Sequence, residues 1–266
     1  METVTHYGRK TAYRVVDTEG PRRLYVHGSG ADHRLWARQY ASGGVALDVS
    51  GHGESEDVDA EPGYETLSAY ADDVLAVAAQ TDCRVLVGNS LGGAVCLHLL
   101  LERGSAADAA FDALVLAGSG AKLGVLSSLR EKLDDDFERA IDFLHEPNRL
   151  LHDPEGLGSD AHNGNDPIAR SKEAMRETGQ AVAQRDFLSC HRFDVRDRLD
   201  EIAMATLALC GEYDRLTPPE YHDFLAREIP DAEREVVPDA AHLAMVERPG
   251  EFDAAVDRFL DRRLGD

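Results

Sequence analysis

The chain has 266 residues, of which 43% are hydrophobic, so it fits a folded protein with a large core and not a disordered one. Its 50 acidic and 28 basic residues give a formal net charge of -22, which disfavours nucleic acid as a ligand because phosphates would be repelled. The apolar runs are too short to span a bilayer and the first residues lack a signal-peptide pattern, so neither a membrane span nor secretion is expected.

Short apolar runs separated by turn-rich loops dominate the first part of the chain. Alternation of apolar and polar residues around Gly8 predicts an antiparallel hairpin at a sheet edge. Later runs predict strands joined by helices. The elements expected here are the hairpin at 3–17, strands at 22–27, 44–48, 85–87 and 111–117, and helices at 35–40, 66–80 and 94–101. Turn-rich loops at 27–30 and 48–55 follow the first two of these strands.

A serine at a sharp turn between a strand and a helix is the main chemical signal. Residues 88–92 read Gly-Asn-Ser-Leu-Gly and match the G-x-S-x-G pattern of a nucleophile elbow. The pattern alone is weak, but a β-branched apolar run ends at Gly88 and a helix-compatible run begins just after it, as an elbow requires. Backbones come so close at such a turn that glycine is the residue that fits. We therefore expect Ser90 to present its hydroxyl at the top of a parallel sheet.

The regular alternation of strands and helices stops in the middle of the chain. Residues 122–201 are helical and charged, with one helix containing Asp134 to Asp136, another over 167–184, and a loose stretch at 153–166 between them. Roughly eighty residues is far more than a connection between two strands needs. The chain is therefore expected to divide into a core of strands and helices, residues 1–120 and 201–266, and a helical lid, residues 121–200.

Alternation resumes in the last third of the chain. The elements expected there are strands at 204–210 and 234–237, a helix opened by Pro218, and an amphipathic helix at 249–264. Strands that alternate with helices favour an α/β fold. We expect a mostly parallel, eight-stranded sheet with helices on both faces.

A serine hydroxyl is a poor nucleophile unless a base and an orienting acid support it. In a parallel sheet such groups come from loops at the carboxyl ends of strands. The loops after the last two expected strands supply Asp214 and His242, so the chain order is serine, acid, histidine, as in elbow-bearing hydrolases. Glu212 and Asp239 lie in the same loops and are rival acids.

Together these motifs resemble those of the α/β-hydrolase fold family over nearly the whole chain. The His-Gly-Ser-Gly sequence at 27–30 resembles the family's oxyanion loop, and 48–55 resembles its D-x-x-G-x-G-x-S turn. Residues 88–93 resemble its elbow, 211–218 its acid loop and 241–249 its histidine loop. The set is specific for the fold and poorly specific for the substrate.

The resemblance implies roles for three side chains. Ser90 would be the nucleophile, His242 the general base and later the general acid, and Asp214 the residue that holds the imidazole tautomer. Asp214 is preferred to Glu212 and Asp239 because the family places its acid a few residues past the strand end.

The resemblance also implies an oxyanion hole. Its donors would be the backbone amides of Ser29 and Leu91, and Leu91 opens a helix whose dipole favours negative charge. Gly28 and Gly30 would let the loop approach the substrate.

The other histidines are expected to play structural or peripheral roles. His27 would support the oxyanion loop, His52 and Asp48 would shape the 48–55 turn, and His98 would pack on its helix. Five more histidines lie on a late helix or in the expected lid, where one could touch substrate: His222, His145, His152, His162 and His191. Trp36 is expected in the core or a pocket wall.

The expected function is hydrolysis of a small carboxylic ester through an acyl-enzyme, without a cofactor or a metal. The four cysteines show no metal-ligand spacing and are expected to be free, buried thiols. Alternatives in the same class are a carbon-carbon bond hydrolase of the meta-cleavage type, a thioesterase and a lactonase. A noncatalytic ligand-binding receptor on the same fold is the alternative of another class. The oligomeric state does not follow from the sequence.

The charge distribution suggests the cellular setting. Acidic residues are spread along the whole chain and only four residues are lysine, a composition that keeps a protein hydrated in molar salt. We expect a cytoplasmic protein from a halophile, with an ordinary acidic protein or a basic partner as the alternatives.

Overall fold

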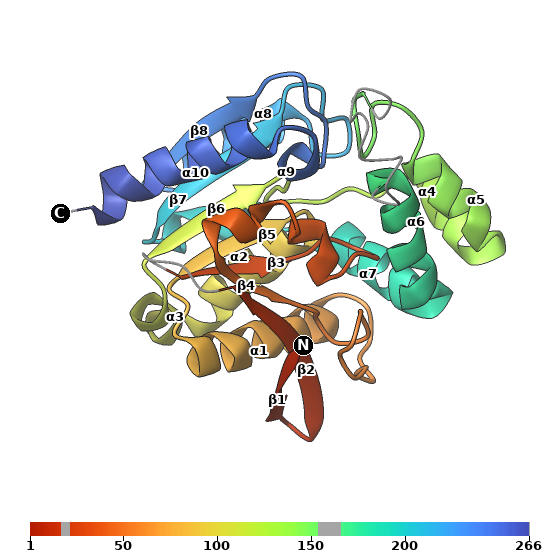
Figure 1. Cartoon of the computed structure of the whole chain (residues 1–266), viewed down its shortest axis with the longest axis horizontal. Helices are drawn as coiled ribbons and strands as arrows, with labels where there is room; N and C mark the ends of the chain where they lie inside the picture. Colours follow the sequence, from red (N-terminus) through yellow and green to blue (C-terminus); the bar gives the residue numbers. More distant parts are fainter. Residues whose placement is uncertain (17–21, 154–165, 266) are drawn as a thin grey trace.

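One eight-stranded sheet organises the described chain, in the order β1-β2-β4-β3-β5-β6-β7-β8 (Figure 1). The computed structural model describes residues 1–16, 22–153 and 166–265. Its strands are β1 (Glu2–His6), β2 (Arg9–Val16), β3 (Arg23–Val26), β4 (Gly44–Leu47), β5 (Val85–Asn89), β6 (Ala113–Ala117), β7 (Ala205–Gly211) and β8 (Ala232–Val237). β1 pairs antiparallel with β2 and β2 with β4, whereas the other neighbours pair in parallel. The expected sheet, with its hairpin at one edge, is confirmed.

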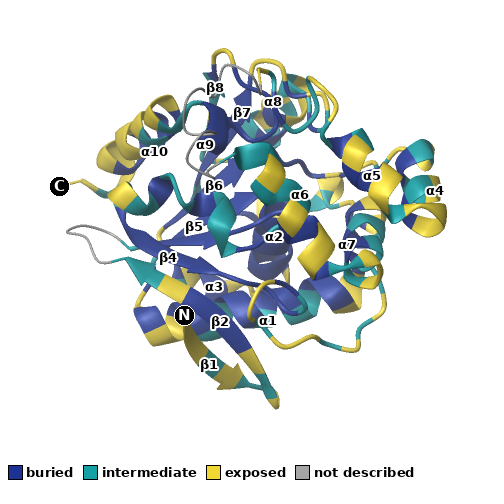
Figure 2. Ribbon diagram, turned by 45° about the vertical axis from the view of Figure 1, so that its right-hand side comes forward, coloured by how far each residue is buried: buried dark blue, intermediate teal, exposed yellow. Residues whose placement is uncertain are grey.

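Both faces of the sheet are buried. Successive side chains of a strand point to opposite sides, so each face packs in an apolar cluster of its own. Leu86 of β5 packs in one apolar cluster, while its neighbours Val85 and Val87 pack in another. The first cluster takes in helices α1 (Tyr64–Thr81), α2 (Leu91–Arg103) and α8 (Pro219–Glu228). The second takes in η1 (His33–Trp36), α9 (Ala244–Glu247) and α10 (Pro249–Leu264). Figure 2 shows the central strands buried between these two layers.

The segment between β6 and β7 is helical, as expected. Its elements are α4 (Ser127–Asp135), α5 (Phe137–Leu144), α6 (Pro167–Thr178), α7 (Gln180–Arg192) and the 3-10 turn η4 (Arg196–Glu201). Helices α4 to α7 share an apolar cluster that includes Leu133, Ile141 and Met175, and they lie together on the right of Figure 1. The division of the chain into a core and a lid stays a prediction.

Helix α7 is also tied to the core. The hydroxyl of Ser189 accepts a hydrogen bond of 2.8 Å from the amide of Gly63, just before α1. The guanidinium of Arg185 donates to the carbonyl of Val58 at 2.6 Å. The last helix of the segment is therefore fastened to α1 and the loop before it.

Some expected helix boundaries are wrong. The helix expected over 167–184 is two helices, because Gly179 adopts a φ of 82° between α6 and α7, a conformation that glycine tolerates. Asp136 is not in one helix with its two neighbours: its side chain accepts from the amide of Arg139 and caps α5. The short helix expected over 35–40 is replaced by two 3-10 turns, η1 and η2 (Gln39–Ser42).

Other parts of the chain add to the sequence-based expectations or fall outside them. A short helix, α3 (Ser105–Ala110), was not expected. Of the loose stretch expected at 153–166, residues 154–165 lie outside the described residues, and His162 with them. The four cysteines are buried and free. Within the described ranges no helix is both long and apolar enough to cross a membrane.

Candidate active site

Ser90 occupies a strained turn between β5 and α2. Its φ is 52° and its ψ is -115°, which is unusual for a residue with a side chain. The turn is tied to the end of β6: the Ser90 amide donates to the carbonyl of Ala117 at 3.0 Å, and the Ser119 hydroxyl donates to the carbonyl of Ser90 at 2.9 Å. The neighbouring strand therefore holds the backbone conformation that the turn requires.

The glycines of the motif lie where the backbone of another segment comes too close for a side chain. A Cβ on Gly88 would lie 2.5 Å from the carbonyl oxygen of Gly92, and one on Gly92 would lie 2.3 Å from the carbonyl oxygen of Val26 in β3. Real Cβ atoms do not come so close to backbone oxygens. The spacing of these glycines thus follows from how tightly α2 returns over β5 and β3.

His242 and Asp214 form a buried pair at the ends of two neighbouring strands. Asp214 follows β7, His242 follows β8, and the His242 Nδ1 lies 2.9 Å from Asp214 Oδ2. The amides of Leu216 and Thr217 donate to Oδ1 at 2.8 and 2.9 Å, and the Thr217 hydroxyl donates to Oδ2 at 2.8 Å. The carboxylate side chain has no exposed surface.

The ionisation of Asp214 sets the tautomer of His242. Burial by itself would raise the pKa of Asp214, but the attraction of His242 and the hydrogen bonds from His242 and Thr217 outweigh it and lower that pKa below its ordinary value. An ionised carboxylate only accepts hydrogen bonds, so Nδ1 must carry the shared proton. When neutral, His242 then has a free lone pair on Nε2.

The rival acids lie elsewhere. Glu212 is exposed and accepts a 3.3 Å hydrogen bond from the amide of Asp239. Asp239 is exposed too, and its carboxylate is 3.8 Å from Arg248. Of the three acids that the sequence offered, the structure brings Asp214 to the histidine.

Ser90 and His242 line the same cavity, whose volume is about 250 Å³. In the described part of the chain no hydrogen bond joins the Ser90 hydroxyl to His242, and catalytic hydrogen bonds are often loose without substrate. Another part of the wall is largely apolar and comes from helices α4 to α7: Leu129 of α4, Phe143 of α5, Met175 of α6 and Phe187 of α7. A polar spot in this wall is His145, whose Nε2 lies 3.0 Å from the Ser171 hydroxyl.

The loop at 27–30 borders the same cavity. Its two glycines are closely packed: a Cβ on Gly28 would lie 3.2 Å from the Cβ of Ser90, and one on Gly30 would lie 3.0 Å from Met175 Cγ. Gly30 also has a φ of +65°. No described residue accepts a hydrogen bond from the amide of Ser29 or of Leu91. Ser29 lines the cavity together with Ser90, and Leu91 follows Ser90 in the chain.

His27 and His222 are buried supports. His27 Nε2 accepts from the amide of Val49 at 3.2 Å, and His222 Nε2 accepts from the amide of Ser119 at 3.2 Å. Burial lowers the pKa of each to about 4, so both are neutral at ordinary pH. His98, by contrast, pairs with the hydroxyl of Ser68 at 2.9 Å and is not among the described residues that line the cavity around Ser90.

The turn after β4 is held by its own acid. Asp48 accepts from the amides of His33 and Glu54 at 2.7 and 3.0 Å, and Ser55 donates to its carbonyl at 2.6 Å. Its carboxylate forms a group with Asp32 and His33 in which three possible ligand atoms lie within 4.8 Å of one another. The carboxylates of Asp32 and Asp48 already accept hydrogen bonds from Arg34 and from the amides of the turn. No cation is therefore needed to balance this cluster.

Asp186 of α7 is a buried residue that the sequence analysis missed. It pairs with His52, whose Nε2 lies 2.9 Å from Asp186 Oδ2. An indirect signal was present in the sequence: the acid stands three residues after Ala183 and four before Cys190, on the stripe of α7 that faces inward. An unexplained acid on an inward stripe needs a buried partner.

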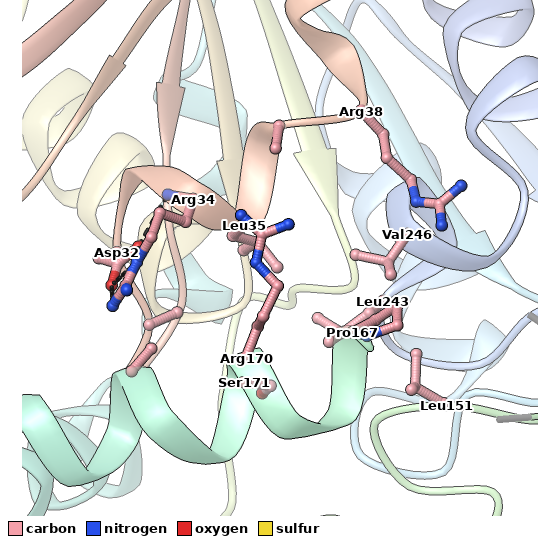
Figure 3. A pocket seen from close by; sticks show the side chains of 13 residues that line it. Asp32, Arg34, Leu35, Arg38, Leu151, Pro167, Arg170, Ser171, Leu243 and Val246 are labelled. Carbon is pink, nitrogen blue, oxygen red and sulfur yellow. Dashed lines mark hydrogen bonds and ion pairs between the residues drawn. The ribbon is translucent and has the colours of Figure 1, made fainter. Parts of the chain in front are cut away.

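A second cavity of about 250 Å³ adjoins the first and shares Ala31, Leu35, Ser171 and Leu243 with it. Figure 3 shows Arg34 against Asp32, and Arg170 extending from α6 toward Leu35. The wall of this cavity is thus more polar than that of the cavity around Ser90.

Comparison with known proteins places the chain among hydrolases. The model of the family described as "Alpha/beta hydrolase family" matches residues 24–255. A pimeloyl-[acyl-carrier protein] methyl ester esterase of Neisseria meningitidis is 29% identical over 90% of this chain and 94% of its own. The 2-hydroxy-6-oxo-6-(2'-aminophenyl)hexa-2,4-dienoic acid hydrolase of Metapseudomonas resinovorans is 26% identical over 92% of this chain and 86% of its own. The structure of a thermophilic esterase superposes with a TM-score of 0.80 at 28% identity, covering 98% of this chain and 97% of that one.

Proposed function

The chain belongs to the alpha/beta hydrolase family and is a hydrolase, and from that premise we propose that it cleaves small carboxylic esters through an acyl-enzyme. Ser90 is the nucleophile, His242 the general base and Asp214 the acid that orients it. The observation that carries the proposal is the buried His242–Asp214 pair, which shares one cavity with a serine on a strained turn.

Acylation needs one proton to move twice. His242 Nε2 takes the proton of the Ser90 hydroxyl as its oxygen attacks the ester carbonyl, and it then gives that proton to the alcohol as the carbon–oxygen bond breaks. Asp214 stays ionised throughout and stabilises the imidazolium. Water repeats the sequence against the acyl-enzyme and releases the acid.

The negative charge of the tetrahedral intermediate needs donors that are in place beforehand. The amides of Ser29 and Leu91 supply them, since both lack acceptors in the described chain, Ser29 lines the cavity with Ser90, and Leu91 follows Ser90 in the chain. Leu91 also begins α2, so the helix dipole adds to the stabilisation.

The proposal is tested by turnover of a graded series of nitrophenyl acyl esters in molar KCl. Ser90→Ala and His242→Ala should each lower kcat roughly 10³-fold or more, because nucleophile and base act as one unit, while the variants stay folded. Because the apolar wall formed by α4 to α7 bounds the cavity, turnover should be highest at one acyl chain length. Near-native turnover by either variant would mean that the triad is wrong.

Carbon-carbon bond hydrolysis is the second candidate. It is supported by the similarity to the Metapseudomonas resinovorans enzyme, whose name gives a 2-hydroxy-6-oxo-dienoic acid as its substrate. A folded protein that hydrolyses none of the esters but consumes such a dienoic acid, in a reaction that Ser90→Ala abolishes, would favour this reading.

For the cellular setting we propose the salt-rich cytoplasm of a halophile, on the strength of a net charge of -22 with four lysines.

A further inference from the structure

Asp186 is a buried carboxylate to which the proposed mechanism gives no part. It belongs to α7, yet it reaches past that helix into the core, and its side chain has no exposed surface. Its Oδ2 accepts from His52 Nε2 at 2.9 Å and from the amide of Gly30 at 3.1 Å, and its Oδ1 accepts from the Tyr70 hydroxyl at 2.8 Å. The carboxylate thus joins α7 to α1 and to two loops at the carboxyl edge of the sheet.

The Gly30 amide is significant because it adjoins Ser29. In a planar trans peptide the N–H and C=O point in opposite directions, so a bond to one group fixes the direction of the other. The carbonyl of Gly28 is held by His27 Nδ1 at 2.9 Å and by the amide of Ala31 at 3.2 Å, which directs the Ser29 N–H the opposite way. Asp186 holds the next peptide through the Gly30 amide.

Of these anchors, Asp186 is the one that comes from a distant element. His27 and Ala31 belong to the loop's own segment, whereas Asp186 is 156 residues from Gly30. A bond from an ionised acceptor is also stronger than one between neutral groups. The loop that presents the Ser29 amide is therefore held from outside by α7.

We propose that Asp186 is a positioning residue, which holds the 27–30 loop so that the Ser29 amide stays aimed at the charge that develops on the substrate. This inference rests on the proposed function. In this role Asp186 makes α7 one of the elements that hold the active site in place. It also connects the helical segment between β6 and β7, which lines the cavity, to the proposed oxyanion hole.

The chain supplies a matched control in Asp73 of α1. Asp73 is also fully buried and accepts several hydrogen bonds. Its donors are the Ser50 amide at 2.7 Å, the Thr11 hydroxyl at 2.9 Å and the Arg9 guanidinium at 3.0 Å. Neither Asp73 nor these partners are among the described residues that line the cavity around Ser90. Its loss should therefore affect folding without affecting the loop.

The test compares Asp186→Asn with Asp73→Asn in kcat, KM and denaturant unfolding, using a nitrophenyl ester in molar KCl. Both variants should unfold more easily. Only Asp186→Asn should lower kcat, by about 10-fold to 100-fold, with KM nearly unchanged, because a misplaced donor weakens the transition state more than the ground state. A kcat near that of the native protein, or an equal loss in Asp73→Asn, would overturn the proposal.

A fluorophosphonate that labels the nucleophilic serine separates this proposal from the proposed function. Native protein that neither hydrolyses esters nor is labelled at Ser90 would overturn the proposed function itself. If native protein is labelled and Asp186→Asn reacts at the same rate, the triad stands and the role of Asp186 is wrong. Should Asp186→Asn fail to fold, Tyr70→Phe removes one hydrogen bond to the carboxylate and should lower the labelling rate roughly three-fold, and an unchanged rate would count against the role of Asp186.

Discussion

Two of the fully buried carboxylates adjoin the proposed oxyanion loop and the proposed triad. Asp214 and Asp186 both have no exposed side-chain surface, and each accepts hydrogen bonds from a histidine and from at least one backbone amide. A carboxylate taken out of water costs several kcal/mol unless such partners replace its hydration. The burial of these acids is therefore possible because the fold brings their donors together.

The pair of His52 and Asp186 predicts how stability depends on pH. Burial by itself would lower the pKa of His52 and raise that of Asp186, but the attraction between the two outweighs it: the His52 pKa rises above 6.5 and the Asp186 pKa falls below 3.8. Asp48, His27 and the Tyr70 hydroxyl also face the pair, and Asp48 helps to raise the His52 pKa.

The sign of the effect follows from these two shifts. The contribution of His52 is fully present below pH 6.5 and is lost as pH rises through its raised folded pKa. That of Asp186 is present above pH 3.8 and is lost as pH falls through its lowered folded pKa. The difference in free energy of unfolding between native protein and Asp186→Asn should therefore be largest between pH 3.8 and 6.5. Denaturant titrations across the pH range measure it, and a difference that grows above pH 6.5 would contradict the pairing.

At the scale of elements, the junction of β5 with α2 is closely packed. It combines a strained Ser90 with glycines that contact the backbone of β3 and of the helix itself. Strain of this kind costs on the order of 1–3 kcal/mol and persists only where the surroundings enforce it. The hydrogen bonds between Ser90 and the end of β6 hold that conformation in place.

Substitution of the first glycine of the elbow tests this account. Gly88→Ala should lower the free energy of unfolding by roughly 1–3 kcal/mol or more, because its Cβ would overlap the carbonyl of Gly92. Gly124→Ala is the matched control, since no atom lies within 4 Å of the Cβ added there. Denaturant unfolding of the two variants gives the comparison, and equal stabilities would show that the junction has more room than the structure allows.

At the scale of the whole molecule, charge is the dominant property. A net charge of -22 makes the folded state repel itself, and the basic residues that oppose it are nearly all arginine. Many of those arginines form exposed ion pairs, such as Arg176 with Glu138 and Arg84 with Asp112. Exposed pairs contribute little each, so they do not remove the repulsion.

Salt should therefore stabilise the protein. The Debye length falls from about 10 Å at 0.1 M to about 3 Å at 1 M, which screens repulsion between dispersed carboxylates. The midpoint of thermal unfolding should rise steadily with KCl over this range, and ester hydrolysis at a fixed temperature should follow it. A protein that is equally stable and active in dilute buffer would contradict the halophilic reading.

Local pattern was enough to predict most of the fold. Alternation in the N-terminal hairpin and short apolar runs elsewhere predicted the eight strands, and the glycine spacing around Ser90 predicted the elbow, because these signals depend on neighbours in the chain. Helix boundaries between β6 and β7 were predicted less well. There a single glycine, Gly179, splits two helices, and Asp136 caps one helix instead of extending another.

What the sequence by itself determined is the family, the order of elements and a short set of candidate residues at the ends of strands. The tertiary structure decided which acid faces His242, which helices line the cavity, and that Asp186 holds the Gly30 amide. The physical reason is separation along the chain. His52 and Asp186 are 134 residues apart, and no local pattern encodes a contact that exists only after the sheet has ordered its strands and α7 has packed against α1.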